Sequence, residues 1–160
     1  MSSSDKNLST TAPLPDAATM RIAIIVSSWN TQITEALYKA AFDTLITAGC
    51  YEGDIMRHDV PGSFELPLGA KWVLDTLTPD AVICLGCVIQ GETRHFDFIC
   101  QAVSSGIMNL NMNYSVPVIF GVLTTENMEQ ALDRAGGKHG NKGVEAAATA
   151  IQMVALGRDI

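Results

Sequence analysis

Residues 81–89, with the sequence AVICLGCVI, form an uninterrupted apolar run. Such a run suits a strand that is buried on both faces, as in a parallel sheet covered by helices on each side. Three other segments also have the character of strands, and they lie at residues 21–27, 54–60 and 116–123. The sequence therefore predicts a parallel sheet of four strands at the centre of the fold.

Segments with helical character alternate with these strands. Asn30 or Thr31 can cap a helix that runs to about residue 48. Further helices are expected over residues 64–77, 96–114, 126–134 and about 142–156. Because strands that alternate with helices connect through right-handed crossovers, we expect a three-layer α/β/α sandwich of flavodoxin-like topology around the four-stranded parallel sheet.

Residues 1–19 differ from the rest of the chain. They are rich in serine, threonine, alanine and proline and contain few large apolar groups, so a flexible N-terminal arm is predicted. Residues 20–160 are expected to form a single domain, which is long enough to bury a substantial core.

Charge and composition limit the partners of such a domain. The 160 residues carry a net charge of -7, which opposes non-specific attraction to nucleic acid or to an anionic membrane. We find no apolar stretch of the roughly 20 residues needed to cross a bilayer, and no hydrophobic segment of a secretory signal. We therefore expect a cytoplasmic protein with small-molecule partners and with neither nucleic acid nor a membrane as partner.

Four cysteines would permit two disulfides or a metal site by number alone. Cys84 and Cys87 form a C-x-x-C pair, but the pair lies inside the predicted strand, where residues three apart point to opposite faces. They cannot converge on one metal ion without breaking the strand. We therefore expect the cysteines to be small buried side chains, and we predict no metal site.

Ligands of parallel sheets gather where strands end in loops at the carboxyl edge. The predicted loops at that edge are residues 28–30, 61–65, 91–95 and 123–126. In the third loop Gly91 lets the backbone approach a ligand, Thr93 offers a hydroxyl, and the following helix turns free N–H groups toward an anion. His95 belongs to the residue type that most readily exchanges protons near neutral pH, so we predict a proton-transfer role for it.

Other residues at this edge have two readings each. Trp29 could offer its flat face to an aromatic ring or pack under the next helix. Asn30 is more often a helix cap than a ligand contact, and it can serve as both. Glu65 could accept hydrogen bonds from sugar or polyol hydroxyls, or interact with a helix dipole. Considered alone, Glu92 and Arg94 are best read as solvated surface.

Residues 134–143, RAGGKHGNKG, combine glycines with cations. The pattern is not a phosphate-binding Walker loop, because Gly143 follows Lys142 and no strand leads in. A helix C-terminus with favourable cations explains part of it. It does not explain the second group of cations, so we predict that Arg134 and Lys142 bind an anion.

Five segments resemble the lumazine synthase family, which makes 6,7-dimethyl-8-ribityllumazine. They are SSWNTQIT at residues 27–34, VPGSFELP at 60–67, GCVIQGETRHFDFIC at 86–100, VIFGVLTTENMEQALDRAG at 118–136 and GNKG at 140–143. The resemblance implies condensation of 5-amino-6-ribitylaminouracil with 3,4-dihydroxy-2-butanone 4-phosphate, the penultimate step of riboflavin biosynthesis. Phosphate and water are released, and no metal or organic cofactor is required.

The resemblance also implies a role for each matching residue. Trp29 matches the ring-stacking aromatic residue, and His95 matches the histidine that moves protons. Positions near the pyrimidine and the ribityl chain fall on Asn30, Ser63, Phe64, Glu65, Val88 and Ile89. The phosphate site falls on Gly91, Glu92 and Thr93, with Arg134 as its side-chain anchor. Phe120 and Lys142 match residues that a neighbouring subunit contributes.

The family assembles as pentamers with active sites between subunits, and some members close twelve pentamers into an icosahedral shell. The turn at residues 136–143 lacks the extra residues typical of pentameric members, which favours the shell. Riboflavin synthase is a further candidate partner. Two rival functions are a flavin- or nucleotide-binding module without enzyme activity, and an aldolase or isomerase that uses Lys142 as a Schiff-base amine.

Overall fold

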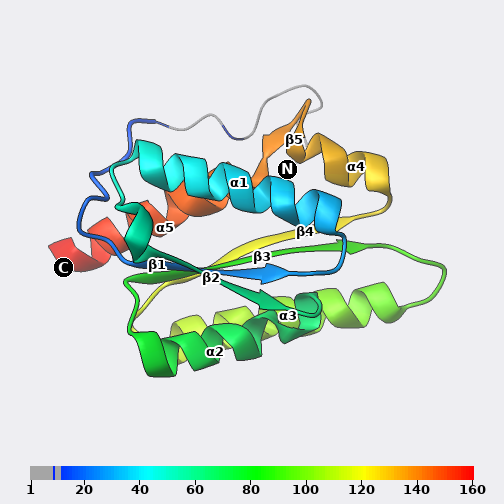
Figure 1. Ribbon diagram of the computed structural model, residues 1–160. Helices are drawn as coiled ribbons and strands as arrows, with labels where there is room; N and C mark the ends of the chain where they lie inside the picture. The colour runs from blue at the N-terminus through cyan, green and yellow to red at the C-terminus, as the bar shows by residue number, and fades with distance from the viewer. Residues whose placement is uncertain (1–8, 10–11) are drawn as a thin grey trace.

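A parallel sheet of strand order β2-β1-β3-β4 forms the centre of the computed structural model, which describes residue 9 and residues 12–160 (Figure 1). β1 (Ile22–Ser27) pairs with β2 (Ile55–Val60) on one side and with β3 (Ala81–Ile89) on the other. β4 (Val118–Thr125) pairs with β3 and forms the far edge. The prediction of a four-stranded parallel sheet is confirmed.

Helices cover both faces of the sheet. α1 (Thr31–Thr47), α5 (Lys142–Asp159) and the short α4 (Met128–Asp133) lie on one face, and α2 (Leu66–Leu77) and α3 (His95–Asn113) lie on the other (Figure 1). This is the predicted three-layer α/β/α sandwich. Over the described residues, none of these helices combines the length and the apolar character that a membrane span requires.

Side chains alternate along each strand, so every strand serves two cores. In β3, Ile83 and Leu85 belong to the core that includes α1 and α5, whereas Val82 and Cys84 belong to the core that includes α2 and α3. Burial on both faces explains why this strand has no polar position.

The same alternation separates the C-x-x-C pair. Cys84 lies in the core beside α2 and α3, and Cys87 lies in the core beside α1 and α5, as predicted. All four cysteines of the chain are free thiols. Burial raises the pKa of Cys84 to about 12 and the pKa of Cys87 to about 11, so both stay protonated and poorly nucleophilic at neutral pH.

β4 is displaced along the chain from the strand predicted at residues 116–123. It begins only at Val118, because Pro117 lacks the N–H group that a strand residue donates. It continues through Thr124 and Thr125, which pair with the last two residues of β3. Threonine is polar but β-branched, and it fits a strand better than its polarity suggests.

The glycine-rich stretch after α4 forms a hairpin of β5 (Ala135–Gly137) and β6 (Gly140–Asn141). Gly136 and Gly140 have φ angles of 110° and 87°, which residues with a side chain seldom adopt. The backbone of the hairpin therefore accounts for these two glycines without a ligand.

Part of the predicted flexible arm, residues 1–8, 10 and 11, lies outside the described residues. Ala17 is fully buried, and its N–H donates to the carbonyl of Ala48 at 2.9 Å. The hydroxyl oxygen of Ser9 accepts from the N–H of Asn141 at 2.6 Å and lies 3.2 Å from a carboxylate oxygen of Glu145. The described part of the N-terminal segment thus contacts the layer of α1 and α5.

Candidate active site

The loops after β1, β2 and β3 meet at one edge of the sheet, because parallel strands deliver their carboxyl ends to the same side. They enclose a cavity of about 450 Å³. The candidate residues in its lining are Trp29, Asn30, Ser63, Phe64, Glu65, Val88, Ile89 and His95. The fold therefore brings residues that are far apart in the sequence around one cavity, which we call the His95 cavity.

Trp29 stands at the mouth of the His95 cavity with 71% of its surface exposed. Its main chain is fixed, because the N–H of Trp29 donates to the carbonyl of Pro61 at 3.2 Å. The reading in which Trp29 packs under the next helix is wrong, since α1 leaves the indole uncovered. An exposed indole on a fixed backbone is suited to stacking against a planar ligand.

Asn30 joins the first loop to β3. Its backbone is left-handed, with φ 57° and ψ 49°, a conformation that asparagine tolerates better than most residues. This backbone directs the side-chain amide to the carbonyl of Cys87, to which it donates at 3.0 Å. Asn30 stands at the N-cap position of α1, as expected, but its side chain makes no capping hydrogen bond, because this amide bonds across to β3 instead.

The one-turn 3₁₀ helix η2 (Ser63–Glu65) carries three candidate residues to the cavity. Glu65 closes the turn, because its Oε2 accepts from the N–H of Gly62 at 3.0 Å. Phe64 projects outward and is 56% exposed. The Oγ of Ser63 is buried, so a contact from Ser63 to a ligand would come from its main chain.

His95 is the first residue of α3, one position before the predicted start of that helix, and its side chain is exposed at the cavity. The main-chain N–H of His95 donates to the hydroxyl oxygen of Thr93 at 3.3 Å. Gly91, Glu92 and Thr93 are exposed in the loop that leads to this helix. The helix N-terminus gives the loop a partial positive potential, which favours an anion close to the imidazole.

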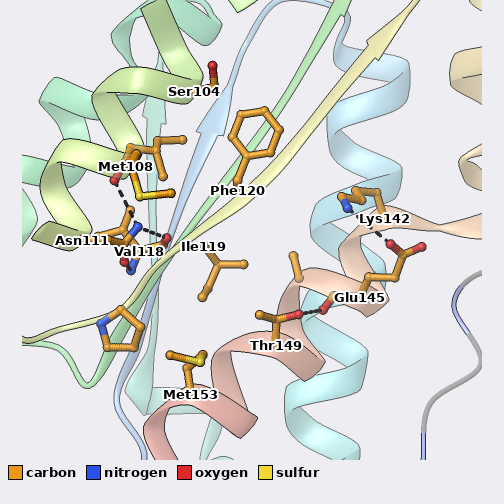
Figure 2. A pocket seen from close by; sticks show the side chains of 13 residues that line it. Ser104, Met108, Asn111, Val118, Ile119, Phe120, Lys142, Glu145, Thr149 and Met153 are labelled. Atoms are coloured by element: carbon orange, nitrogen blue, oxygen red, sulfur yellow. Dashed lines mark hydrogen bonds and ion pairs between the residues drawn. The ribbon is translucent and has the colours of Figure 1, made fainter. Parts of the chain in front are cut away.

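Phe120 and Lys142 lie elsewhere. They line a groove of about 480 Å³ along the edge of the sheet, between α3, β4 and α5. Figure 2 shows Phe120 projecting from β4, with the side chains of α3 on one side and Lys142 on the other. Over the part of the chain that the structure describes, this β4 groove and the His95 cavity share no lining residue.

Arg134 belongs with Lys142. One nitrogen of the Arg134 guanidinium donates to the carboxylate of Glu145 at 2.6 Å, and another donates to the carbonyl of His139 at 2.7 Å. Lys142 contacts the other oxygen of the same carboxylate at 3.3 Å (Figure 2). The side chains of Arg134 and Glu145 are only 18% and 21% exposed. A single carboxylate therefore holds two cations together in a partly desolvated cluster.

Sequence reasoning missed Glu145. It follows Lys142 by three residues in a segment predicted to be helical, and this spacing brings side chains together on a helix surface. That signal predicts contact between Lys142 and Glu145. It gives no indication of the bond to Arg134, which depends on how the hairpin folds back onto α5.

Comparison with known proteins identifies the family. A family model described as 6,7-dimethyl-8-ribityllumazine synthase matches residues 19–158. The chain belongs to the lumazine synthase family. A 6,7-dimethyl-8-ribityllumazine synthase of Cytophaga hutchinsonii is 58% identical over 156 residues, which cover 97% of this chain and 98% of the relative. The synthase of that name from Flavobacterium johnsoniae is 54% identical and covers 96% of this chain and 82% of the relative. The predicted family and the predicted transferase activity in riboflavin biosynthesis are confirmed.

Proposed function

We propose that lumazine synthesis takes place in a site shared between two copies of the chain, in which the His95 cavity of one copy meets the cluster of Phe120, Arg134 and Lys142 of its neighbour. The reaction joins 5-amino-6-ribitylaminouracil to 3,4-dihydroxy-2-butanone 4-phosphate. The observation that carries the proposal is the division of the candidate residues into two separate places on one chain.

Complementary apolar surfaces support this assembly. Phe64 in η2 and Leu68 and Trp72 in α2 follow one another at a spacing of four residues, and all three side chains are exposed; we call them the α2 row. The β4 groove is lined by further apolar side chains, among them Met108 and Met153 (Figure 2). Exposed apolar surface of this extent is typical of an interface. If the α2 row of one copy covers the β4 groove of the next, Phe64 at the His95 cavity approaches Phe120 of the neighbour.

An interface between two different patches repeats around a ring when its rotation closes. A pentamer is one such ring, and it is the assembly that the family resemblance implies. Twelve pentamers in an icosahedral shell, with riboflavin synthase as a partner, remain predictions that light scattering and co-purification test. A cytoplasmic location is supported by the free thiols, which reducing compartments maintain.

The pyrimidine end of the site is built from β3. β1 pairs with β3 only as far as Leu85, so the last residues of β3 have no strand beside them on that flank among the described residues. The carbonyl of Cys87 on this flank accepts from Asn30. The main-chain groups of Ile89, two residues further along, point the same way and would bind the edge of a pyrimidine. Trp29 would stack on its ring.

The chemistry requires protons to move and phosphate to leave. The ribitylamine-bearing pyrimidine supplies an amine that attacks the ketone, water leaves to give an imine, phosphate is eliminated, and ring closure releases a second water. His95 would carry these protons. Arg134 and Lys142 of the neighbour, with the N–H groups at the start of α3, would hold the phosphate and favour its departure. Holding two substrates together should supply much of the acceleration.

Mixed assemblies test the shared site directly. His95→Ala and Arg134→Ala are each expected to make a slow enzyme. If subunits are exchanged by dissociation and reassembly in equal amounts, about one interface in four pairs an intact His95 with an intact Arg134 from the neighbour. Lumazine fluorescence should then recover to about a quarter of the unmodified rate. Mass spectrometry would verify that the assemblies are mixed. If lumazine formation does not recover in such mixed assemblies, both residues act in the site of one subunit.

Trp29 has a separate test. In a Trp72→Phe background, Trp29 is the one remaining tryptophan of the chain. Binding of the pyrimidine substrate should quench its fluorescence. Trp29→Phe should retain most activity, whereas Trp29→Ala should raise the KM for the pyrimidine about tenfold through lost stacking. Equal KM values for the two variants would contradict the stacking role.

A further inference from the structure

Gly86 lies in β3 directly against η2. A Cβ atom added at Gly86 would lie 2.5 Å from the Oγ of Ser63, 3.4 Å from the Cβ of Ser63 and 2.9 Å from a methyl group of Leu66. Real Cβ atoms essentially never approach another heavy atom within 3.0 Å. The hydroxyl of Ser63 therefore occupies the volume that a side chain at position 86 would fill.

Hydrogen bonding does not explain why Ser63 lies there. The residue is 6% exposed, and its Oγ has no hydrogen-bond partner among residues 9 and 12–160. The Oγ of Ser27 likewise has no hydrogen-bond partner within the described chain, and Ser27 follows Val26, which forms the last β1 pair with β3 opposite Leu85. Buried hydroxyls without partners cost stability. Close packing against the bare Cα of Gly86 is thus what sets the height of Ser63 above the sheet.

The position of Ser63 matters because η2 also carries Phe64 and Glu65 into the His95 cavity. We propose that Gly86 is a positioning residue for the pyrimidine end of the active site. Its missing side chain lets η2 approach β3 closely enough for Phe64 and Glu65 to meet the substrate opposite Trp29. This inference rests on the proposed binding role of the cavity residues.

A methyl group at position 86 would force η2 outward until the 2.5 Å contact with the Oγ of Ser63 opened to at least 3.0 Å. Phe64 and Glu65 would move with it, since they belong to the same helical turn. Removing the hydroxyl leaves the Cβ of Ser63 at 3.4 Å, an ordinary van der Waals contact. The clash with Leu66 at 2.9 Å involves the far end of a fully buried side chain, which must shift slightly in both variants. Ser63→Ala should therefore compensate for Gly86→Ala.

The test compares steady-state kinetics of Gly86→Ala with those of Gly86→Ala/Ser63→Ala. The single variant should raise the KM for the ribitylaminouracil about tenfold while changing the KM for the butanone phosphate by less than about twofold. The double variant should return the first KM to within about threefold of the unmodified enzyme. Gly69→Ala is the matched control, because a Cβ there would lie 2.9 Å from a methyl of Val60 and would crowd α2 without touching Ser63. Ser63→Ala should not rescue it.

A double variant no better than Gly86→Ala would overturn the inference, as would a fall in melting temperature with an unchanged KM. If Gly86→Ala does not fold, Ser63→Cys presses on Gly86 from the other side with a larger atom and should produce the same selective rise in KM. An unchanged KM there would also overturn it. Phe64→Ala separates this inference from the proposed function: if that variant leaves the KM unaltered, the binding role of the cavity itself fails.

Discussion

Glu145 should compete with phosphate for Arg134, and Glu145→Gln isolates this competition. Glutamine keeps the shape of the side chain and one acceptor oxygen but removes the negative charge. In the unmodified chain the carboxylate lies 2.6 Å from Arg134 and 3.3 Å from Lys142. A phosphate that approaches these cations must therefore displace the carboxylate or share them with it.

The size of the effect follows from Coulomb's law. Two unit charges about 4 Å apart attract each other by about 4 kcal/mol at an effective dielectric constant of about 20. The side chains of Arg134 and Glu145 are 18% and 21% exposed, so water screens part of this attraction. We expect about 1.4 kcal/mol to remain, which corresponds to a factor of about ten in phosphate affinity.

The assay is inhibition by inorganic phosphate, measured against the butanone phosphate. Glu145→Gln should lower the inhibition constant about tenfold, and phosphate should raise the melting temperature of the variant more than that of the unmodified enzyme. Glu52→Gln is the control, because it removes the same charge in the turn that precedes β2, at the opposite edge of the sheet. An inhibition constant that rises in Glu145→Gln would refute the reasoning and would mean that the carboxylate orders the cations for phosphate.

Three further predictions concern stability. Ser27→Ala removes a buried hydroxyl that has no hydrogen-bond partner in the described chain, so the variant should melt at a temperature higher by roughly 2–4 °C. A lower melting temperature in a thermal scan would contradict this prediction. Gly143→Ala places a methyl against the carbonyl of Leu37, so α1 and α5 must separate. Urea titration should show that the free energy of unfolding falls by about 3 kcal/mol, and an unchanged value would mean that the two helices adapt freely. The raised pKa values of Cys84 and Cys87, about 12 and about 11, mean that the unfolded chain loses protons first above pH 9. The free energy of unfolding should therefore fall as the pH rises from 9 toward 11, less steeply in Cys84→Ala/Cys87→Ala.

The parts of the site that could be predicted are those fixed by local pattern and by parallel topology. Trp29 and His95 follow strands of one parallel sheet, so their meeting at the carboxyl edge follows from the strand order alone. Asn30 occupies the N-cap position of α1, but the partner of its side chain could not be predicted, because the choice between a capping bond and a bond to Cys87 depends on a strand 57 residues away. No local pattern carries that information.

The sequence by itself determined the layers of this protein. A short apolar run without polar positions at residues 81–89 favours a strand covered on both faces, and the helical segments between strands supply the cover. Only the tertiary structure decided how the elements meet: Glu145 against Arg134, Ser63 against Gly86, and Phe120 and Lys142 apart from His95. The physical reason is that burial patterns repeat every two or four residues and are readable locally, whereas side-chain contacts between elements depend on loop paths and packing distances that the whole fold sets.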